Sequence, residues 1–484
     1  MSARPDRAKS GSRAVPLRAV LALATAAFAS AAVGCDRRPI DVVWVVVDAL
    51  PARATGLYGG RSDVTPQLAA IAERAIVIEN AYAQAPSTLP SAAAYLTGVY
   101  PDRAVAAVRD GSAPQLGQWL RAAGYRTAAF SENPWVSHLW GFDAGFEVFE
   151  EISHPPDRPR GYRDSAATLE AALAWLLDDD AKPSFLYLHL LRPHAPYVPP
   201  PPFRGMLTDP EAAPAGEEVE KLLDGRTPPD QALMTIMLAA REGQIAFAPK
   251  LIEYVERRYL ENVAFADHLV GLLWERIEHA GRSESTLLVI SSDHGEAFGP
   301  HPELFHGSTL YDDQIRVPLL IVAPQSLGLE AKRRISGMVE LVDIAPTVLD
   351  LLGLEVDAAF DGASIVPWLR SEGEPPDVAR AFLDEAQAVV GREWKLIQSP
   401  SGRALFERGS DPDELRDRGD EQPEQVAELA ALLAPRESAT ATGDPPALPP
   451  EVIAELESIG YAAGEGGKGD ERRSRATESR KSSR

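Results

Sequence analysis

Two acidic residues and a histidine follow apolar runs of the kind that form buried strands. Asp48 comes directly after the run Val42–Val47. Asp293 and His294 follow the run Leu287–Ile290. In open α/β sheets, ligands bind beyond the carboxyl ends of the strands. A carboxylate at the end of a fully apolar run is unusual without a partner, so these residues are candidates for a cation or substrate site.

Thr88 and His194 are further candidates for chemistry. Thr88 precedes Leu-Pro-Ser and an alanine-rich helical stretch that stops at Gly98. Its hydroxyl is expected to cap the amino terminus of that helix, a position that favours anions, although capping alone would explain a threonine there. His194 follows the apolar run Phe185–Leu190. Within that run, His189 alternates with apolar residues, which is typical of a hydrogen-bonded core histidine.

These residues must be positioned by strands and helices that alternate over most of the chain. The alternation predicts an α/β fold with a doubly wound, mainly parallel sheet and helices on both faces. The runs expected to form buried strands are Val42–Val47, Ala75–Ile78, Thr127–Phe130, Phe185–Leu190, Leu287–Ile290 and Leu319–Val322. The stretches expected to form helices are Pro66–Arg74, Ala113–Ala123, Asp164–Leu177 and Tyr254–Ala280.

The carboxyl-terminal part of the chain predicts a smaller unit. Residues 380–461 contain short alternating pieces and a helix near Pro423–Leu433, which together predict a small antiparallel α+β subdomain. The candidate site residues all fall within 35–370, which is expected to be the main domain. A proline-rich stretch opens a segment, 199–250, that is expected to leave the core. The Gly-, Ser- and Arg-rich tail 462–484 is expected to be disordered.

The composition narrows the class of protein. The 484 residues are 45% hydrophobic and 25% charged, which is a globular profile. Lys and Arg number 48 against 71 Asp and Glu, so the formal net charge is −23. A surface this acidic repels nucleic acid, and we expect no nucleic-acid partner. The only cysteine is Cys35, which excludes an intrachain disulfide and a cysteine metal cluster.

The amino terminus predicts export. Residues 1–18 are rich in Arg, and a stretch of small apolar residues runs from Ala19 to Gly34. This is the pattern of a signal peptide, and it is short for a spanning helix. The stretch leads into Ala32–Cys35, which resembles a bacterial lipobox. We expect a lipoprotein signal, 1–34, and a lipid on Cys35 that anchors the protein on the periplasmic or cell-surface side of a membrane. An ordinary cleaved signal with an incidental cysteine is the alternative.

The motifs of the chain resemble those of the sulfatase family of the alkaline-phosphatase superfamily. They are Val45–Asp48, Asn80–Tyr82, Thr88–Ser91, Leu96–Gly98, Gly124–Thr127, Pro193–Tyr197, Ser292–Glu296, Arg316–Leu319, Trp394–Ile397 and Ile459–Tyr461. No one motif is specific to that family. Their shared order over nearly all of the chain after the signal makes the resemblance specific.

The resemblance implies an alkaline-phosphatase-like fold and a metal site. By similarity to the family, Thr88 is the nucleophile, and it binds one divalent cation together with Asp48, Asp293 and His294. A cation held by carboxylates lowers the pKa of a bound hydroxyl and neutralises charge on an anionic ester. Ca, Mg or Mn is favoured over Zn as the ion, although oxygen ligands with one imidazole suit several ions.

Two further histidines have counterparts in the resemblance. His194 resembles the histidine that contacts the anion or the leaving group, and His306 resembles another residue of the substrate pocket. An imidazole suits both tasks near neutral pH. The implied substrate is an anionic ester of a glycan or a lipid.

The nucleophile position distinguishes this chain from most hydrolytic sulfatases. They usually convert a Cys or Ser there to formylglycine, whereas this chain has Thr88. Formylglycine chemistry is therefore not expected. We expect a sulfatase-like hydrolase that cleaves a sulfate or phosphate ester with a metal-activated threonine. A threonine also resembles the relatives that transfer phosphoglycerol or phosphoethanolamine and the phosphodiesterases, so a phospho-alcohol headgroup transferase or a phosphodiesterase is the first alternative.

The chain also departs from the family pattern. The residue after the metal-binding Asp is usually Asp or Thr, but here it is Ala49. The Arg or His that usually follows Pro-Ser is Ala92. Loss of an arginine weakens anion binding because its bidentate contact is lost. The second alternative is therefore a catalytically degenerate lipoprotein that binds an anion, and Asn133 is a candidate to replace a lost donor.

Overall fold

The computed structural model describes residues 38–152, 164–178, 181–208, 233, 235–237, 239, 248–302, 304–433 and 448–459. All elements given below belong to one compact unit, Pro39–Arg484. The predicted signal with Cys35, most of the segment 199–250 and the tail 462–484 lie outside the described residues. No helix in the described part of the chain is both long and apolar enough to cross a bilayer.

An eight-stranded sheet forms the centre of the unit, in the order β4-β3-β5-β1-β6-β7-β2-β8. The strands are β1 (Asp41–Val47), β2 (Ile76–Tyr82), β3 (Arg126–Ser131), β4 (Val148–Glu151), β5 (Ser184–Leu190), β6 (Thr286–Ser291), β7 (Arg316–Val322) and β8 (Arg333–Glu340). Neighbouring strands are parallel except where β7 pairs with β6 and with β2. The predicted mainly parallel α/β fold is confirmed.

The sequence does not predict the two edge strands, β4 and β8. The physical reason is that neither strand is buried along its whole length. β4 is half-buried or exposed along its length, and β8 begins with two arginines. Neither therefore has the continuous apolar run that marks a strand covered on both faces. The central strands β1, β5 and β6 are buried at every position, and the sequence predicts all three.

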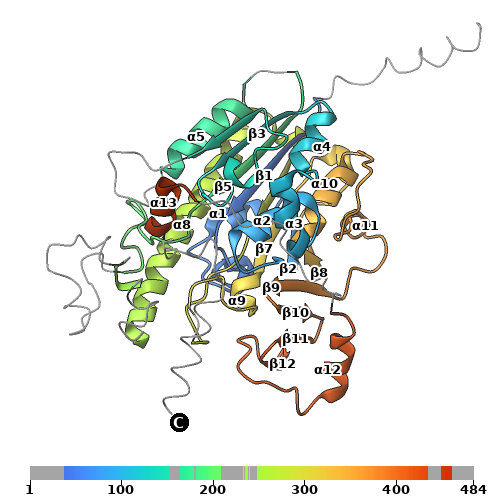
Figure 1. The fold of residues 1–484 in the computed structure, drawn as a ribbon. Helices are drawn as coiled ribbons and strands as arrows, with labels where there is room; N and C mark the ends of the chain where they lie inside the picture. Colours follow the sequence, from blue (N-terminus) through green and yellow to red (C-terminus); the bar gives the residue numbers. More distant parts are fainter. Residues whose placement is uncertain are drawn as a thin grey trace, which may run out of the picture. The chain divides into compact units, whose positions relative to one another are not determined.

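Helices cover both faces of this sheet, and β1 divides its side chains between the two layers (Figure 1). Val43, Val45 and Val47 pack with α1 (Pro66–Ala72), α5 (Ser165–Leu176) and α8 (Pro249–His279). Val42, Trp44 and Val46 pack on the opposite face, which is covered by the helices α2 (Thr88–Thr97), α3 (Pro101–Asp110), α4 (Leu116–Ala122), α10 (Ile344–Leu351) and α11 (Val366–Leu369). Successive side chains of a strand point to opposite faces, so an all-apolar strand indicates two covered faces.

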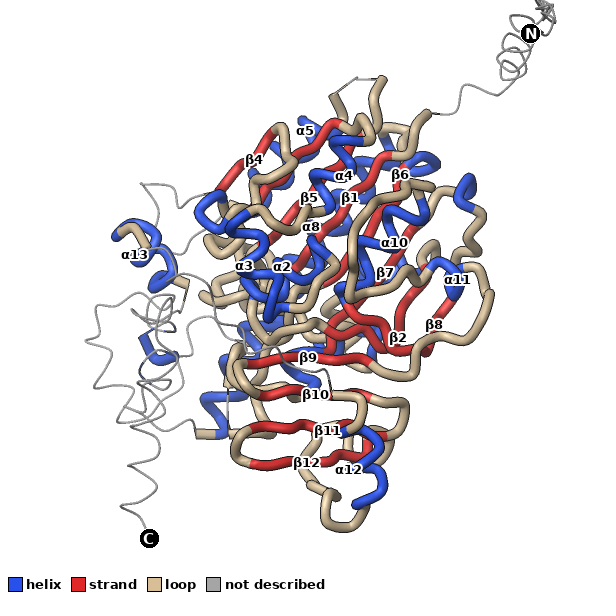
Figure 2. The backbone as a smooth tube through the Cα atoms, turned by 45° about the vertical axis from the view of Figure 1, so that its right-hand side comes forward, coloured by secondary structure: helices blue, strands red, loops and turns tan. Residues whose placement is uncertain are grey.

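A second, antiparallel sheet has the order β12-β11-β10-β9 and lies beyond the β2–β8 side of the first sheet (Figure 2). Its strands are β9 (Ala379–Leu383), β10 (Ala386–Val390), β11 (Trp394–Ser399) and β12 (Gly402–Glu407), and α12 (Pro423–Ala430) packs against it. The predicted antiparallel α+β region is therefore present. The boundaries 35–370 and 380–461 remain predictions.

Lys395 joins this sheet to the segment that precedes β7. Its side chain is fully buried, and Nζ lies 2.7 Å from Asp312 Oδ1 in α9 (Asp312–Ile315) and 2.6 Å from Glu414 Oε1. Burial alone would lower the pKa of Lys395, but the two carboxylates raise it overall, so the ammonium stays charged. This ion cluster fixes the small sheet on the main unit.

Replacement of Lys395 by methionine is expected to destabilise the protein by about 3–5 kcal/mol, because it leaves the buried carboxylate of Glu414 and the half-buried carboxylate of Asp312 without this cation. Denaturant unfolding followed by circular dichroism measures this change. Arg74→Met is the control, since Arg74 pairs with Glu278 at the surface and its loss should cost about 1 kcal/mol or less. Equal midpoints for Lys395→Met and the unmodified protein would contradict the proposed role of the cluster.

Candidate active site

The carboxyl ends of β1 and β6 bring two acidic residues together. The strands pair in parallel with Val46 opposite Ser291, so Asp48 and Asp293 both emerge two residues later at the same edge of the sheet. With His294 they form a group whose potential ligand atoms all lie within 4.8 Å of one another. All three side chains are fully buried.

This arrangement fits a cation. Among the described residues, Asp48 Oδ1 and Asp293 Oδ2 are buried carboxylate oxygens that accept no hydrogen bond. An uncompensated buried carboxylate is costly, and two side by side also repel each other. Burial alone would raise the pKa of Asp48, but His194, His189 and His294 lower it well below its usual value. Asp48 is therefore ionised and available as a ligand.

His294 directs its Nε2 atom toward the same two carboxylates. Its Nδ1 lies 2.8 Å from the carbonyl oxygen of Gly295, which can only accept, so Nδ1 carries the proton in a neutral ring. The Nε2 lone pair then faces Asp293 Oδ2 at 3.5 Å and Asp48 Oδ1 at 3.6 Å. Burial alone would lower the pKa of His294, but the two carboxylates raise it overall in the absence of a cation.

Thr88 also contacts this group, and the expectation that its hydroxyl caps a helix is wrong. Ser87 occupies the capping position, and Thr88 is the first residue of α2. Its Oγ1 lies 3.2 Å from His294 Nε2 and 3.2 Å from Asn133 Nδ2. The hydroxyl therefore points away from the helix and into the site, at a helix amino terminus whose dipole favours anions.

The backbone around Ala49 holds the carboxylates in place. Ala49 has φ 55°, a left-handed conformation that is strained for a residue with a side chain. Its N–H donates to Asp293 Oδ1 over 3.2 Å, and its carbonyl accepts from the Tyr259 hydroxyl over 2.7 Å. The position that usually carries Asp or Thr in the family thus acts here through its backbone alone.

Gly295 is needed for close packing of the segment that follows β6. A Cβ at this position would lie 2.2 Å from the carbonyl oxygen of Asp313. The N–H of Gly295 donates to the carbonyl of Gln314 over 2.8 Å. The Asp-His-Gly sequence therefore combines two site residues with the one residue that lets the neighbouring backbone approach them.

His194 and His306 form an imidazole wall beside His294. The ring centroid of His306 lies 4.8 Å from that of His194 and 4.5 Å from that of His294. His194 Nδ1 lies 2.9 Å from the carbonyl oxygen of Ala195. His306 Nδ1 lies 2.8 Å from Glu296 Oε1. Burial raises the pKa of Glu296 to about 7, with His194 opposing the shift.

Two residues contact the site more closely than the sequence predicts. Asn133 was a candidate donor, and its Nδ2 lies 2.5 Å from Asp48 Oδ2 as well as near Thr88. The sequence pattern favours a hydrogen-bonded core position for His189, but its Nε2 lies 3.2 Å from Asp48 Oδ2. The sequence signal that could have placed His189 at the site is its position one residue before the end of the predicted strand Phe185–Leu190. In the structure this strand pairs with β1, and His189 lies opposite Val46.

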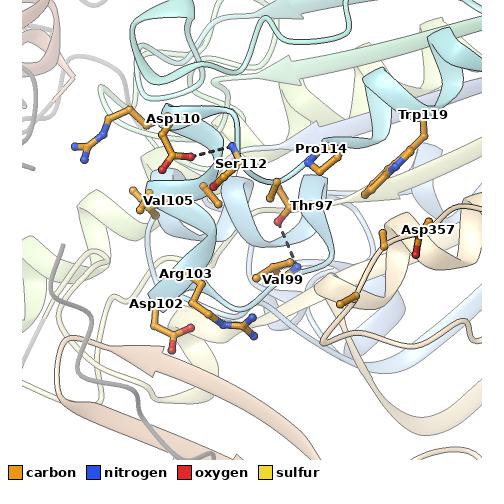
Figure 3. Close-up of a pocket in the computed structure, with 16 residues that line it drawn as sticks. Thr97, Val99, Asp102, Arg103, Val105, Asp110, Ser112, Pro114, Trp119 and Asp357 are labelled. Atoms are coloured by element: carbon orange, nitrogen blue, oxygen red, sulfur yellow. Dashed lines mark hydrogen bonds between the residues drawn. The ribbon is translucent and has the colours of Figure 1, made fainter. Parts of the chain in front are cut away.

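Of two hollows in the described part of the chain, one is lined by a residue of this site. A cavity of about 280 Å³ is bounded by Asn133, His138 and Val452, the last from α13 (Pro450–Ser458). A larger one of about 680 Å³ lies at the other end of α2, between Thr97, α3 and Trp119 of α4 (Figure 3). A ten-residue helix is about 15 Å long, so the larger hollow is separate from Thr88.

Known protein families match this chain over most of its length. The family model Sulfatase matches residues 40–354, and N-sulphoglucosamine sulphohydrolase, C-terminal, matches residues 301–436. The chain therefore belongs to the sulfatase family, within the alkaline-phosphatase superfamily, and is a sulfatase-like hydrolase of sulfate esters. Sulfatases normally bind a divalent metal ion.

Individual relatives agree with this assignment. The N-acetylglucosamine-6-O-sulfatase of Bacteroides thetaiotaomicron is 25% identical, over 70% of this chain and 72% of its own. The choline-sulfatase of Rhizobium meliloti is 26% identical, over 78% of this chain and 82% of its own. The crystal structure of the phosphonate monoester hydrolase of Agrobacterium radiobacter has a TM-score of 0.64 and 20% identity, covering 81% of this chain and 96% of its own, which shows a common fold.

Replacement of Asp293 by alanine is expected to weaken metal binding by about 100-fold or more, because it removes a charged ligand. Elemental analysis of the protein after dialysis measures the bound metal. Asp357→Ala is the matched control because Asp357 is exposed and distant from the group, and it should keep full occupancy. Unchanged metal content in Asp293→Ala would remove this carboxylate from the site.

Proposed function

We propose that the protein cleaves a sulfate or phosphate ester with Thr88 as its nucleophile and one divalent cation bound by Asp48, Asp293 and His294. The observation that carries this proposal is the position of the Thr88 hydroxyl. The hydroxyl lies against His294 and Asn133, beside two buried carboxylates with unpaired oxygens, while Ser87 occupies the capping position of α2. A threonine that served only to cap α2 would not be placed there.

The residues of the site divide the work of binding. Asp48, Asp293, His294 and Thr88 would hold the cation. A bound cation would lower the pKa of the Thr88 hydroxyl, so that this hydroxyl would lose its proton to water, and would offset the negative charge of the ester. Asn133 donates to Asp48 and to the Thr88 hydroxyl and so orients the metal ligand and the nucleophile.

Hydrolysis takes two steps. Thr88 Oγ attacks sulfur or phosphorus, the bond to the leaving oxygen breaks, and that oxygen takes a proton from His194, with His306 beside it in the pocket. Water then attacks the threonine ester and returns a proton to the same imidazole. The bond to Thr88 breaks, and sulfate or phosphate leaves.

The substrate class is supported by the relatives. One of those described above is named for a sulfated amino sugar, and the other is named for choline sulfate. We propose a sulfated glycan as the substrate. Phosphate esters are the second candidate, because Thr88 stands where formylglycine-forming sulfatases have Cys or Ser. The resulting threonine ester can be cleaved by water, which is hydrolysis, or passed to an acceptor alcohol, which is transfer.

Thr88→Ala is expected to lower kcat by roughly 1,000-fold or more, because it removes the attacking oxygen. Purified enzyme is assayed on 6-O-sulfated glucosamine oligosaccharides, an aryl sulfate, a phosphomonoester and a phosphodiester. Thr97→Ala is the matched control, since Thr97 lies at the other end of the same helix and its hydroxyl bonds the carbonyl of Ala93. Equal rates in Thr88→Ala and Thr97→Ala would reject the nucleophile.

The place of action is a further part of the proposal. The pattern at 1–34 and Cys35 supports an exported protein that is held at a membrane by a lipid. This location would give the enzyme access to extracellular glycans before they are taken up.

Cys35→Ser is expected to abolish incorporation of radiolabelled palmitate, because the thiol is the proposed attachment point. The protein should then move from the membrane fraction to the soluble fraction on centrifugation. Equal labelling of both proteins, or a membrane-bound Cys35→Ser variant, would contradict the lipid anchor without affecting the assignment of the site.

A further inference from the structure

We propose that His189 is an additional ligand of the cation, so that the site binds a nitrogen-preferring ion such as Zn²⁺ in preference to Ca²⁺ or Mg²⁺. The inference rests on the proposed function only in its premise that Asp48, Asp293 and His294 hold a cation. The position of a second imidazole favours a nitrogen-preferring ion, whereas the sequence alone predicts a hard, oxygen-preferring one.

The geometry places His189 on the same two carboxylates as His294. His189 Nε2 lies 3.2 Å from Asp48 Oδ2 and 3.9 Å from Asp293 Oδ2. Asp293 Oδ2 accepts no hydrogen bond in the described part of the chain, and His294 Nε2 lies 3.5 Å from it. One unpaired, buried carboxylate oxygen therefore lies within 4 Å of two imidazole nitrogens.

The other side of the His189 ring is held by two tyrosines. His189 Nδ1 lies 2.9 Å from the Tyr187 hydroxyl, which lies 2.7 Å from the hydroxyl of Tyr95 in α2. Tyr95 in turn packs on Trp44, with 5.0 Å between the ring centroids. All of these side chains are fully buried. The ring is thus fixed with Nε2 toward the carboxylates.

This arrangement has the form of the outer shell of a metal-binding histidine. Such a histidine usually gives its second N–H to a fixed acceptor, which sets the tautomer and the ring orientation. Burial raises the pKa of the Tyr95 hydroxyl and that of the Tyr187 hydroxyl well above the usual value for tyrosine. Both phenols therefore keep their protons and remain neutral partners. When Tyr187 accepts from Nδ1, the lone pair of Nε2 faces Asp48 and Asp293.

The second imidazole also compensates for a ligand that this chain lacks. The family pattern places Asp or Thr directly after the first metal-binding Asp, whereas Ala49 offers only its backbone to Asp293. His189 reaches the same carboxylates from β5, the strand on the other side of β1 from β6. The exchange of an oxygen ligand for a nitrogen changes the preferred ion. Ca²⁺ takes six to eight oxygen ligands, whereas two imidazoles with carboxylates suit Zn²⁺ and other transition ions.

The competing role for His189 is a hydrogen bond. In the other tautomer, Nε2–H donates to Asp48 and Tyr187 donates to Nδ1, so His189 orients a ligand without binding the ion. Both roles would reduce activity when His189 is replaced. The two are separated by the number of nitrogen atoms bound to the metal.

The experiment counts these nitrogens. The full-length protein is purified in detergent, stripped with a chelator, loaded with Mn²⁺ and examined by pulsed electron paramagnetic resonance, which detects coordinated imidazole nitrogen. Two imidazoles are expected in the unmodified protein and one in His189→Ala. His268→Ala, which removes an exposed histidine of α8, is the matched control and should keep two.

Metal competition supplies the second measurement. The preference for Zn²⁺ over Ca²⁺ is expected to fall by about 100-fold in His189→Ala. His189→Asn keeps a side chain of similar polarity if the alanine variant does not fold, and it should show the same loss. One imidazole in the unmodified protein overturns the proposal, and this result does not depend on the variants.

These readouts are separate from turnover. A metal bound through a single imidazole, with Thr88-dependent hydrolysis intact, would overturn the role of His189 and leave the proposed function standing. Two imidazoles in a protein that hydrolyses none of the esters would support His189 as a ligand and reject the proposed function.

Discussion

The structure depends on two carboxylates that lie side by side in the protein interior. Asp48 and Asp293 are fully buried, and an oxygen of each accepts no hydrogen bond among the described residues. Their repulsion and their lost hydration must be offset by positive charge. The surrounding imidazoles offset part of this cost, and a divalent cation would offset far more. The two carboxylates therefore fit a divalent cation at this edge of the sheet.

The rest of the fold can be understood as the framework for this pair. The parallel pairing of β1 and β6 sets the distance between the two carboxylates, and α2 directs the Thr88 hydroxyl toward them. The strained backbone of Ala49 donates to Asp293. Strain of this kind persists only where the surrounding structure holds it, and here Tyr259 of α8 fixes the same residue from the other side.

The parts of this framework that the sequence predicts are those encoded by local pattern. Val42–Val47 and Leu287–Ile290 are continuous apolar runs, so they predict central strands, and the polar residues after them predict a site at the strand ends. The half-buried strand β4 has no such run and could not be recognised. Local pattern also misplaced the Thr88 hydroxyl, because the choice between capping a helix and contacting His294 is made by residues more than 200 positions away.

The same limit explains His189. An isolated histidine in an apolar strand is compatible with either a core position or a ligand, and the difference lies in its neighbour across the sheet. That neighbour is set by the register of β5 on β1, which no stretch of sequence contains. The resemblance to sulfatases does not reveal this register either, because it assigns roles only to the positions that match the motifs of the family.

The order of strands in the sheet also has a consequence for how the chain folds. β1 is made first, yet its two neighbours are β5 and β6, and Ala49 bonds a residue 244 positions later. Contacts of such long sequence separation form slowly because a large loop must close first. The apolar strand β1 therefore waits, exposed, until most of the polypeptide has emerged. A strand that stays unpaired for so long exposes apolar surface, which makes the chain prone to aggregation during that interval.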